Sequence, residues 1–133
     1  MVVAATTYFL DHVVNKAMIP GKIESWVAIF DLTNVGTTQI SNKNIQQVVK
    51  VMQRNYPGRL YKFFGIEVSM VFRAMWGLAH KFVDDFTKLK MSIHGDGSDY
   101  APEMLKLIAP ENLQKKYGGT AENVTQFWPP VFK

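Results

Sequence analysis

The sequence SMVFRAMWGLAHKFV, residues 69–83, is apolar on nearly every side of the helix that it predicts. A helix on the surface of a globular protein normally has one apolar face and one polar face. At 15 residues, the segment is shorter than the roughly 20 residues that span a bilayer. The segment is therefore predicted either to be a core helix buried on several sides, or to contact an apolar partner outside its own fold.

Composition indicates one folded domain with one core. The chain has 133 residues, of which 47% are hydrophobic and 13% aromatic, and it contains no cysteine. The absence of cysteine excludes disulfides and thiolate metal sites, and favours a reducing compartment. The first 14 residues, MVVAATTYFLDHVV, lack the basic start of a signal peptide, and no apolar run predicts a transmembrane helix.

Basic residues are concentrated in one part of the chain, which has a net charge of +4. Residues 43–66 contain no acidic residue and five basic ones: Lys43, Lys50, Arg54, Arg59 and Lys62. Such a pattern suits an anionic membrane or nucleic acid, and it equally suits a solvated helix face followed by a turn. No nucleic-acid-binding motif accompanies it, so nucleic acid is not an expected partner.

Helical and strand patterns alternate along the chain. Helices are predicted from a cap at Thr7 through Ala17, from a cap at Ser41 to Tyr56, over residues 69–83, and from Pro102 to Ile108. Strands are predicted at Trp26–Leu32, which reads as covered on both faces, at Leu60–Ile66 and at Lys88–Ile93, with a turn at Asp84–Thr87. This order predicts an α/β fold with a small, mostly parallel β-sheet and helices packed on it.

No catalytic residue, metal site or cofactor is predicted. An acid–base pair could be assembled from Asp31, His80 and His94, but nothing in their spacing requires it. The glycines at 95 and 97 lack the lysine and hydroxyl of a phosphate-binding loop. What remains is a surplus of large apolar side chains, which suits either a dense core or a lipid-sized cavity with residues 69–83 as its door.

Four short motifs occur in an order that is typical of one family. They are the strand at 26–32 followed by Gly36, QRNYPGRL at 53–60, FVD at 82–84, and a segment from Leu105 that ends LQKKYGG at 113–119. Together, over residues 9–119, they resemble the CRAL-TRIO, or Sec14-like, lipid-binding domain, whose corresponding motifs read QNYPERL, FLD and LPKEYGG. The resemblance assigns residues 1–119 to a Sec14-like lobe and residues 120–133 to a C-terminal tail.

The resemblance implies an apolar pocket gated by the helix at 69–83, from which a non-enzymatic, cytoplasmic protein transfers a phospholipid or other lipophile at membrane surfaces. The alternative that it implies is a protein-interaction module like those found near GTPase regulators. The expected pocket and gate residues are Trp26, Ala28, Phe30, Phe64, Met70, Phe72, Met75, Trp76 and Phe82. The expected headgroup or membrane contacts are Arg59, Lys62 and Lys90.

The sequence departs from the family at the residues that hold headgroups. Lys90 occupies the lysine position of phosphatidylinositol-handling members, but Gly58 stands in place of their glutamate. Trp26 and Ala28 stand where phosphatidylcholine-contacting members have serine and threonine. The sequence therefore does not identify the headgroup of the lipid that the pocket would bind. The family's N-terminal helical segment is also expected to be missing, and the uncovered sheet edge would favour a homodimer.

Overall fold

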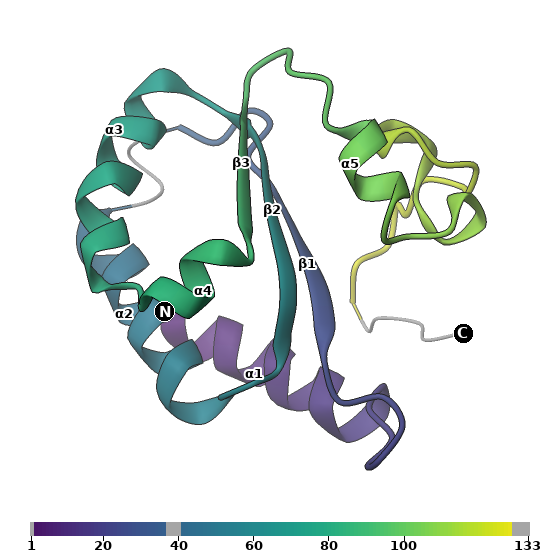
Figure 1. Cartoon of the computed structure of the whole chain (residues 1–133), viewed down its shortest axis with the longest axis horizontal. Coiled ribbons are helices and arrows are strands. Elements are labelled where there is room, and N and C mark those ends of the chain that lie inside the picture. The colour runs from purple at the N-terminus through teal and green to yellow at the C-terminus, as the bar shows by residue number, and fades with distance from the viewer. Residues whose placement is uncertain (1, 37–40, 129–133) are drawn as a thin grey trace. The chain divides into compact units, whose positions relative to one another are not determined.

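The computed structural model of the chain describes residues 2–36 and 41–128, which form two compact units, Met1–Asp96 and Gly97–Lys133 (Figure 1). The first unit contains α1 (Val2–Lys16), β1 (Trp26–Asp31), α2 (Asn42–Asn55), β2 (Leu60–Val68), α3 (Met70–Ala79), a 3₁₀ turn (His80–Phe82), α4 (Asp85–Leu89) and β3 (Met91–Gly95). The second contains α5 (Ala101–Leu105) and 3₁₀ turns at Pro110–Asn112 and Lys115–Tyr117. The end of the predicted tail, residues 129–133, lies outside the described residues.

The sheet of the first unit has the order β1-β2-β3, and both strand pairs are parallel. This confirms the predicted α/β fold. Helices α2, α3 and α4 lie to one side of the strands, whereas α1 crosses the lower part of the strands in this view (Figure 1). The central strand β2 holds the core, since Phe64 and Ile66 are 0% exposed. The prediction that the first strand is covered on both faces is wrong at Phe30, which is 50% exposed on an edge strand.

A bulge near the end of β2 changes which side chains face the helices. Phe63 and Gly65 face them, so strict alternation would bring Glu67 to the same side. Glu67 instead has a φ of 51°, and the pairing with β3 shifts between Gly65 and Val68. The extra residue turns Val68 toward the helices, as a β-bulge does.

Two of the predicted helix caps are confirmed and one is wrong. Ser41 accepts a hydrogen bond from the Asn44 N–H, and Ser69 accepts one from the Phe72 N–H. Thr7 is not a cap, because α1 already begins at Val2. The helix at 69–83 is also shorter than predicted, since regular α-helix ends at Ala79 and gives way to the 3₁₀ turn.

The predicted strand at Lys88–Ile93 begins too early. Asp84 accepts hydrogen bonds from the N–H and the hydroxyl of Thr87, and so caps a short helix that includes Lys88 and Leu89. The strand β3 follows only at Met91. Alternating apolar residues suggested the longer strand, but the local cap at Asp84 determines the backbone here.

The second unit packs around two buried side chains, Met104 and Leu113, which are 0% and 2% exposed. Gly119 lies so close to Leu113 that a Cβ at this position would be 1.9 Å from the Leu113 carbonyl oxygen. Residues just after Gly119 continue this unit, since the N–H of Thr120 donates to the carbonyl of Pro110 at 2.8 Å. The glycine pair of the LQKKYGG motif therefore serves close packing and a turn.

Candidate functional site

A cavity of about 390 Å³ lies in the first unit, between the sheet and the helices. Its wall combines one face of α2, two side chains of α3, the start of α4 and the helix-facing side of all three strands. The lining is largely apolar: Trp26, Phe30, Leu32, Ile45, Val48, Val49, Met52, Tyr56, Pro57, Gly58, Leu60, Phe63, Gly65, Val68, Phe72, Trp76, Val83, Phe86, Met91 and Ile93, with Asn44, Gln53, Asp84, Thr87 and Lys90. Concave, mostly apolar sites of this kind are the usual form of small-molecule pockets.

Helix α3 is apolar on two opposite faces. Phe72 and Trp76, four residues apart, line the cavity. Val71 and Leu78, which lie on the other side of the helix, are 57% and 55% exposed, and Met70 is 86% exposed. The prediction of a core helix buried on several sides is therefore wrong, and α3 is a single apolar layer between cavity and solvent.

Five of the twelve site residues predicted from sequence line the cavity. They are Trp26, Phe30, Phe72, Trp76 and Lys90. The other seven do not line it: Ala28, Arg59, Lys62, Phe64, Met70, Met75 and Phe82.

Two of these seven lie on the far side of the sheet. Successive strand residues alternate in direction, so Phe64 points away from the cavity that Phe63 and Gly65 face. The Phe64 ring stacks on His94 with centroids 6.5 Å apart, and the Lys62 Nζ lies 5.5 Å from the Phe64 ring centre.

Other predicted contacts face solvent or bind the protein itself. The Phe82 ring, 48% exposed, lies 5.7 Å from the Lys50 Nζ on α2. The Arg59 Nη1 donates to the Glu24 carbonyl at 3.0 Å, which ties the start of β2 to the loop before β1. Neither residue lines the cavity.

Sequence reasoning missed most of the wall that α2 supplies. Their spacing puts Ile45, Val48, Val49 and Met52 on one apolar face of the helix predicted after Ser41, and that face borders the cavity. Helical periodicity identifies such a face but does not say whether packed side chains or an open space lie opposite. The lining residues Asp84, Phe86 and Thr87 were missed because α4 was not predicted.

Tyr56, which lines the cavity, connects α2 to α1. Its hydroxyl donates to the Asp11 carboxylate at 2.6 Å, and its ring lies 5.9 Å from the ring of Trp26. Burial, and then the hydrogen bond to Asp11, raise the pKa of Tyr56 to about 12. The indole N–H of Trp26 is buried and has no hydrogen-bond partner among the described residues.

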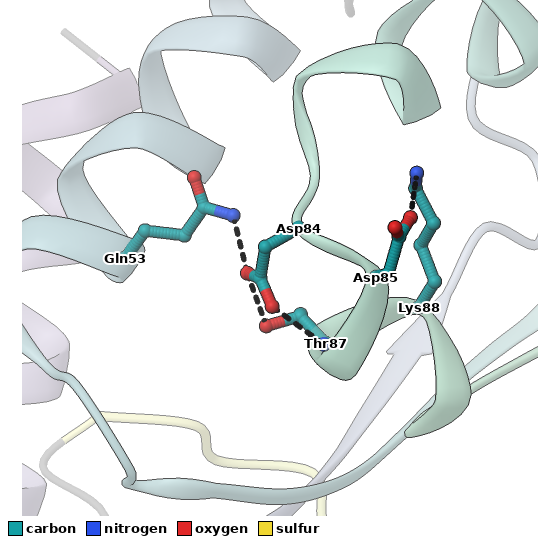
Figure 2. Close-up of polar contacts among 5 residues, drawn as sticks. All are labelled: Gln53, Asp84, Asp85, Thr87 and Lys88. Atoms are coloured by element: carbon teal, nitrogen blue, oxygen red, sulfur yellow. Dashed lines mark hydrogen bonds and ion pairs between the residues drawn. The ribbon is translucent and has the colours of Figure 1, made fainter.

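Asp84 connects α4 to α2 just beyond the 3₁₀ turn that follows α3, as Figure 2 shows. Its carboxylate accepts from the Gln53 Nε2 at 2.8 Å and from the Thr87 hydroxyl at 2.6 Å. The hydrogen bonds from the Thr87 side chain and backbone lower the pKa of Asp84. Figure 2 also shows the neighbouring Asp85, whose carboxylate forms an ion pair with the Lys88 Nζ at 2.7 Å, three residues along the chain.

Asp31 and possible metal ligands were also considered in the part of the chain that the structure describes. The Asp31 carboxylate, one member of the acid–base pair considered above, accepts both the N–H and the hydroxyl of Thr33. Over residues 2–36 and 41–128, no group of three or more histidines and carboxylates could hold a metal ion. Within the same ranges, no helix has the length and apolarity to cross a membrane.

The Tyr56 hydroxyl is expected to ionise near pH 12, against about 10 for a free tyrosine. The native state favours the neutral phenol, so the stability that this group provides is complete below pH 10 and is lost as pH rises through 12. Spectrophotometric titration of the wild type and of Tyr56→Phe should therefore show that the variant lacks a late-titrating phenol. Loss of a phenol that titrates near pH 10 would contradict the assignment.

Replacing Asp84 by alanine is expected to destabilise the protein by about 1 kcal/mol at pH 7, the usual cost of a lost helix N-cap. Because the native pKa of Asp84 is lowered, its contribution is present above the unfolded-state pKa of about 3.9 and disappears as pH falls through the native pKa. Urea unfolding at pH 7 and at lower pH measures both effects.

The matched control is Asp85→Ala, which removes the neighbouring carboxylate and its exposed ion pair with Lys88. Such surface pairs contribute little to stability, so this variant should unfold almost like the wild type. Equal destabilisation by the two substitutions would show that the Asp84 carboxylate stabilises the protein no more than an exposed surface carboxylate does.

Comparison with known proteins assigns the chain to a family. The model of the CRAL/TRIO domain matches residues 2–119. The chain is 36% identical over 104 residues to the Sec14 cytosolic factor of Schizosaccharomyces pombe, covering 77% of this chain and 36% of that protein. It is 32% identical over 100 residues to the phosphatidylinositol/phosphatidylcholine transfer protein SFH7 of Arabidopsis thaliana, covering 73% of this chain and 18% of that protein.

A solved structure agrees with these sequence matches. The crystal structure of Sfh5 superposes with a TM-score of 0.51 at 26% identity, covering 59% of this chain and 28% of that chain. The chain thus spans about a third or less of the length of each of these relatives. The family match, the parallel sheet and the cavity beneath α3 agree, and the chain belongs to the CRAL/TRIO domain family.

Proposed function

We propose that the chain binds a lipophilic molecule in the cavity beneath α3 and transfers it between membranes, without catalysing a reaction. The observation that carries the proposal is the cavity itself, whose wall is nearly all apolar and includes Phe72 and Trp76 of α3. The printed names of the relatives add support, since SFH7 is called a phosphatidylinositol/phosphatidylcholine transfer protein. A concave apolar pocket favours lipid carriage over the protein-interaction alternative, which needs only an exposed patch.

In this proposal α3 is the gate of the cavity, the element that moves to let the ligand enter and leave. Its outward side chains Val71 and Leu78 are more than half exposed, at a cost of roughly 25 cal/mol for each Å² of apolar surface in water. A bilayer would take up this surface, and so would lower the cost of moving α3 away from the cavity. The exposed cations Arg73 and Lys81 in the same segment would add attraction to anionic lipid, at about 1 kcal/mol for each well-placed charge.

The proposal extends to location and assembly. We place the protein in the cytosol with peripheral attachment to membranes, in keeping with the printed name of the Schizosaccharomyces pombe relative. Residues 1–119 would form the lipid-binding lobe, and residues 120–133 would be a C-terminal tail whose first residue, Thr120, still bonds to Pro110 of the second unit. The edge strand β1 pairs only with β2 among the described residues, which supports a homodimer formed by strand pairing.

Leu78→Glu tests whether the outer face of α3 meets the membrane. The substitution places a charge on an exposed side chain, so folding and ligand capacity should be unchanged while transfer between vesicles falls at least tenfold. Transfer of a fluorescent lipid from donor to acceptor vesicles, with and without anionic lipid, measures this directly.

Tyr8→Glu is the control, because Tyr8 is 64% exposed and lies on α1, outside the proposed gate helix α3. This variant should transfer lipid as fast as the wild type. If Leu78→Glu transfers at the wild-type rate, α3 does not open at the membrane. If the wild type transfers no lipid at all, the transfer function itself is wrong.

A further inference from the structure

The strand β1 is an edge of the sheet, and among the described residues it pairs only with β2. Its sequence, WVAIFD, contains no lysine or proline of the kind that usually protects an edge strand from pairing with another chain. Its one charged group, the Asp31 carboxylate, accepts from Thr33 of the same chain. Since Phe30 is 50% exposed, part of this edge is open to solvent. The edge is therefore suited to pairing with a further strand.

The backbone of β1 bonds to β2 on one side and is directed outward on the other. The N–H groups of Trp26 and Leu32 donate to carbonyls of the segment 59–66 at 2.8 and 3.1 Å. Backbone groups alternate in direction along a strand, so the even-numbered residues bond to β2. The N–H and carbonyl groups of Val27 and Ile29 therefore point to the open side, where a further strand would meet them.

The opposite edge of the sheet, β3, is less suited to such pairing. It has five residues against the six of β1, and it ends in Gly95. The pairing of β3 with β2 is interrupted by a register shift between Gly65 and Val68. The corresponding shift in the pairing of β1 falls at its first residue, so the rest of that strand is regular. A longer and more regular edge forms more hydrogen bonds with a new strand.

The side chains of β1 are complementary to an antiparallel copy of the same strand. When Ile29 is paired with its own copy, the outward backbone groups of the two strands meet, and Phe30 lies opposite Ala28 of the second copy. The Cα atoms of such a non-hydrogen-bonded pair approach to about 4.5 Å, so a large side chain beside a small one fills the space. Moving one strand by two residues would instead place Trp26 opposite Phe30 and leave a gap between two alanines.

We infer that two copies of the chain pair through β1 in this register and form one continuous sheet. The inference rests on the homodimer proposed above and defines its interface. Paired side chains lie on the same face of a sheet, so α3 of both copies, which lies on the helix side of the strands, would lie on one face of the joined sheet (Figure 1). One membrane then meets both gate helices, and two linked contacts hold more strongly than either alone. Phe30 also lines the cavity, so the second copy covers this part of its wall.

The test introduces single cysteines into a chain that has none. In the inferred register, the Cα atoms of residue 29 in the two copies lie about 5.5 Å apart, which suits a disulfide. Val27→Cys is the matched control, because Val27 lies on the same face of β1 but about 13 Å from its own copy. With oxidised glutathione as the oxidant, Ile29→Cys should give at least tenfold more disulfide-linked dimer than Val27→Cys.

Two measurements on the wild type need no variant to fold. Light scattering should give twice the mass of one chain. Amide hydrogen exchange at Val27 and Ile29 should slow as the protein concentration rises, whereas exchange at Ala28 and Phe30, whose N–H groups face β2, should not change.

A wild type that remains monomeric at about 0.1 mM would overturn the inference, since its dissociation constant would then be weaker than that. A dimer that cross-links equally through both cysteines, or through neither, would also overturn it, because another register or another surface would then join the copies. The vesicle assay decides the carrier function separately. A monomer that transfers lipid would refute only the interface, and a dimer that transfers none would refute only the carrier function.

Discussion

The apolar character of α3 on both of its faces is the constraint on which the rest of the structure depends. The inner side chains Phe72 and Trp76 line a cavity, and the outer ones, such as Leu78, are more than half exposed. A helix built only for stability would place polar residues outside. The exposed apolar surface costs free energy in water, and that cost is recovered only where another apolar phase is available. The sequence of α3 thus fits the contact with lipid that we propose.

The other elements hold this helix in place without filling the space behind it. Tyr56, at the end of α2, ties this helix to α1 through Asp11. Less than one turn earlier, Gln53 of α2 donates to Asp84, which immediately follows the buried Val83. The two hydrogen bonds brace the frame around the cavity, so that the apolar face of α2 can border open space. The parallel sheet supplies the opposite wall, and the bulge at Glu67 adds Val68 to it.

The fold was predictable because its sequence signals are local, whereas most of the residues that line the cavity were not predicted as site residues. Alternating apolar runs and the caps at Ser41 and Ser69 were enough to give a parallel α/β sheet. Phe64 was assigned to the pocket because it is large and apolar, but strand alternation turns it to the other face. Periodicity located the apolar face of α2 without revealing that a cavity lies against it. The role of Asp84 depends on Gln53, 31 residues away, and no local pattern encodes that contact.

Organic extraction of the purified protein, followed by mass spectrometry, tests the central claim most directly. A carrier whose apolar cavity is lined by an apolar helix should retain a lipophile through purification, because leaving the cavity exposes more of the ligand to water. The account predicts one lipophilic molecule for each folded chain, removed when the protein is unfolded. A protein that stays folded, yields no extractable lipophile and takes none from vesicles would contradict it.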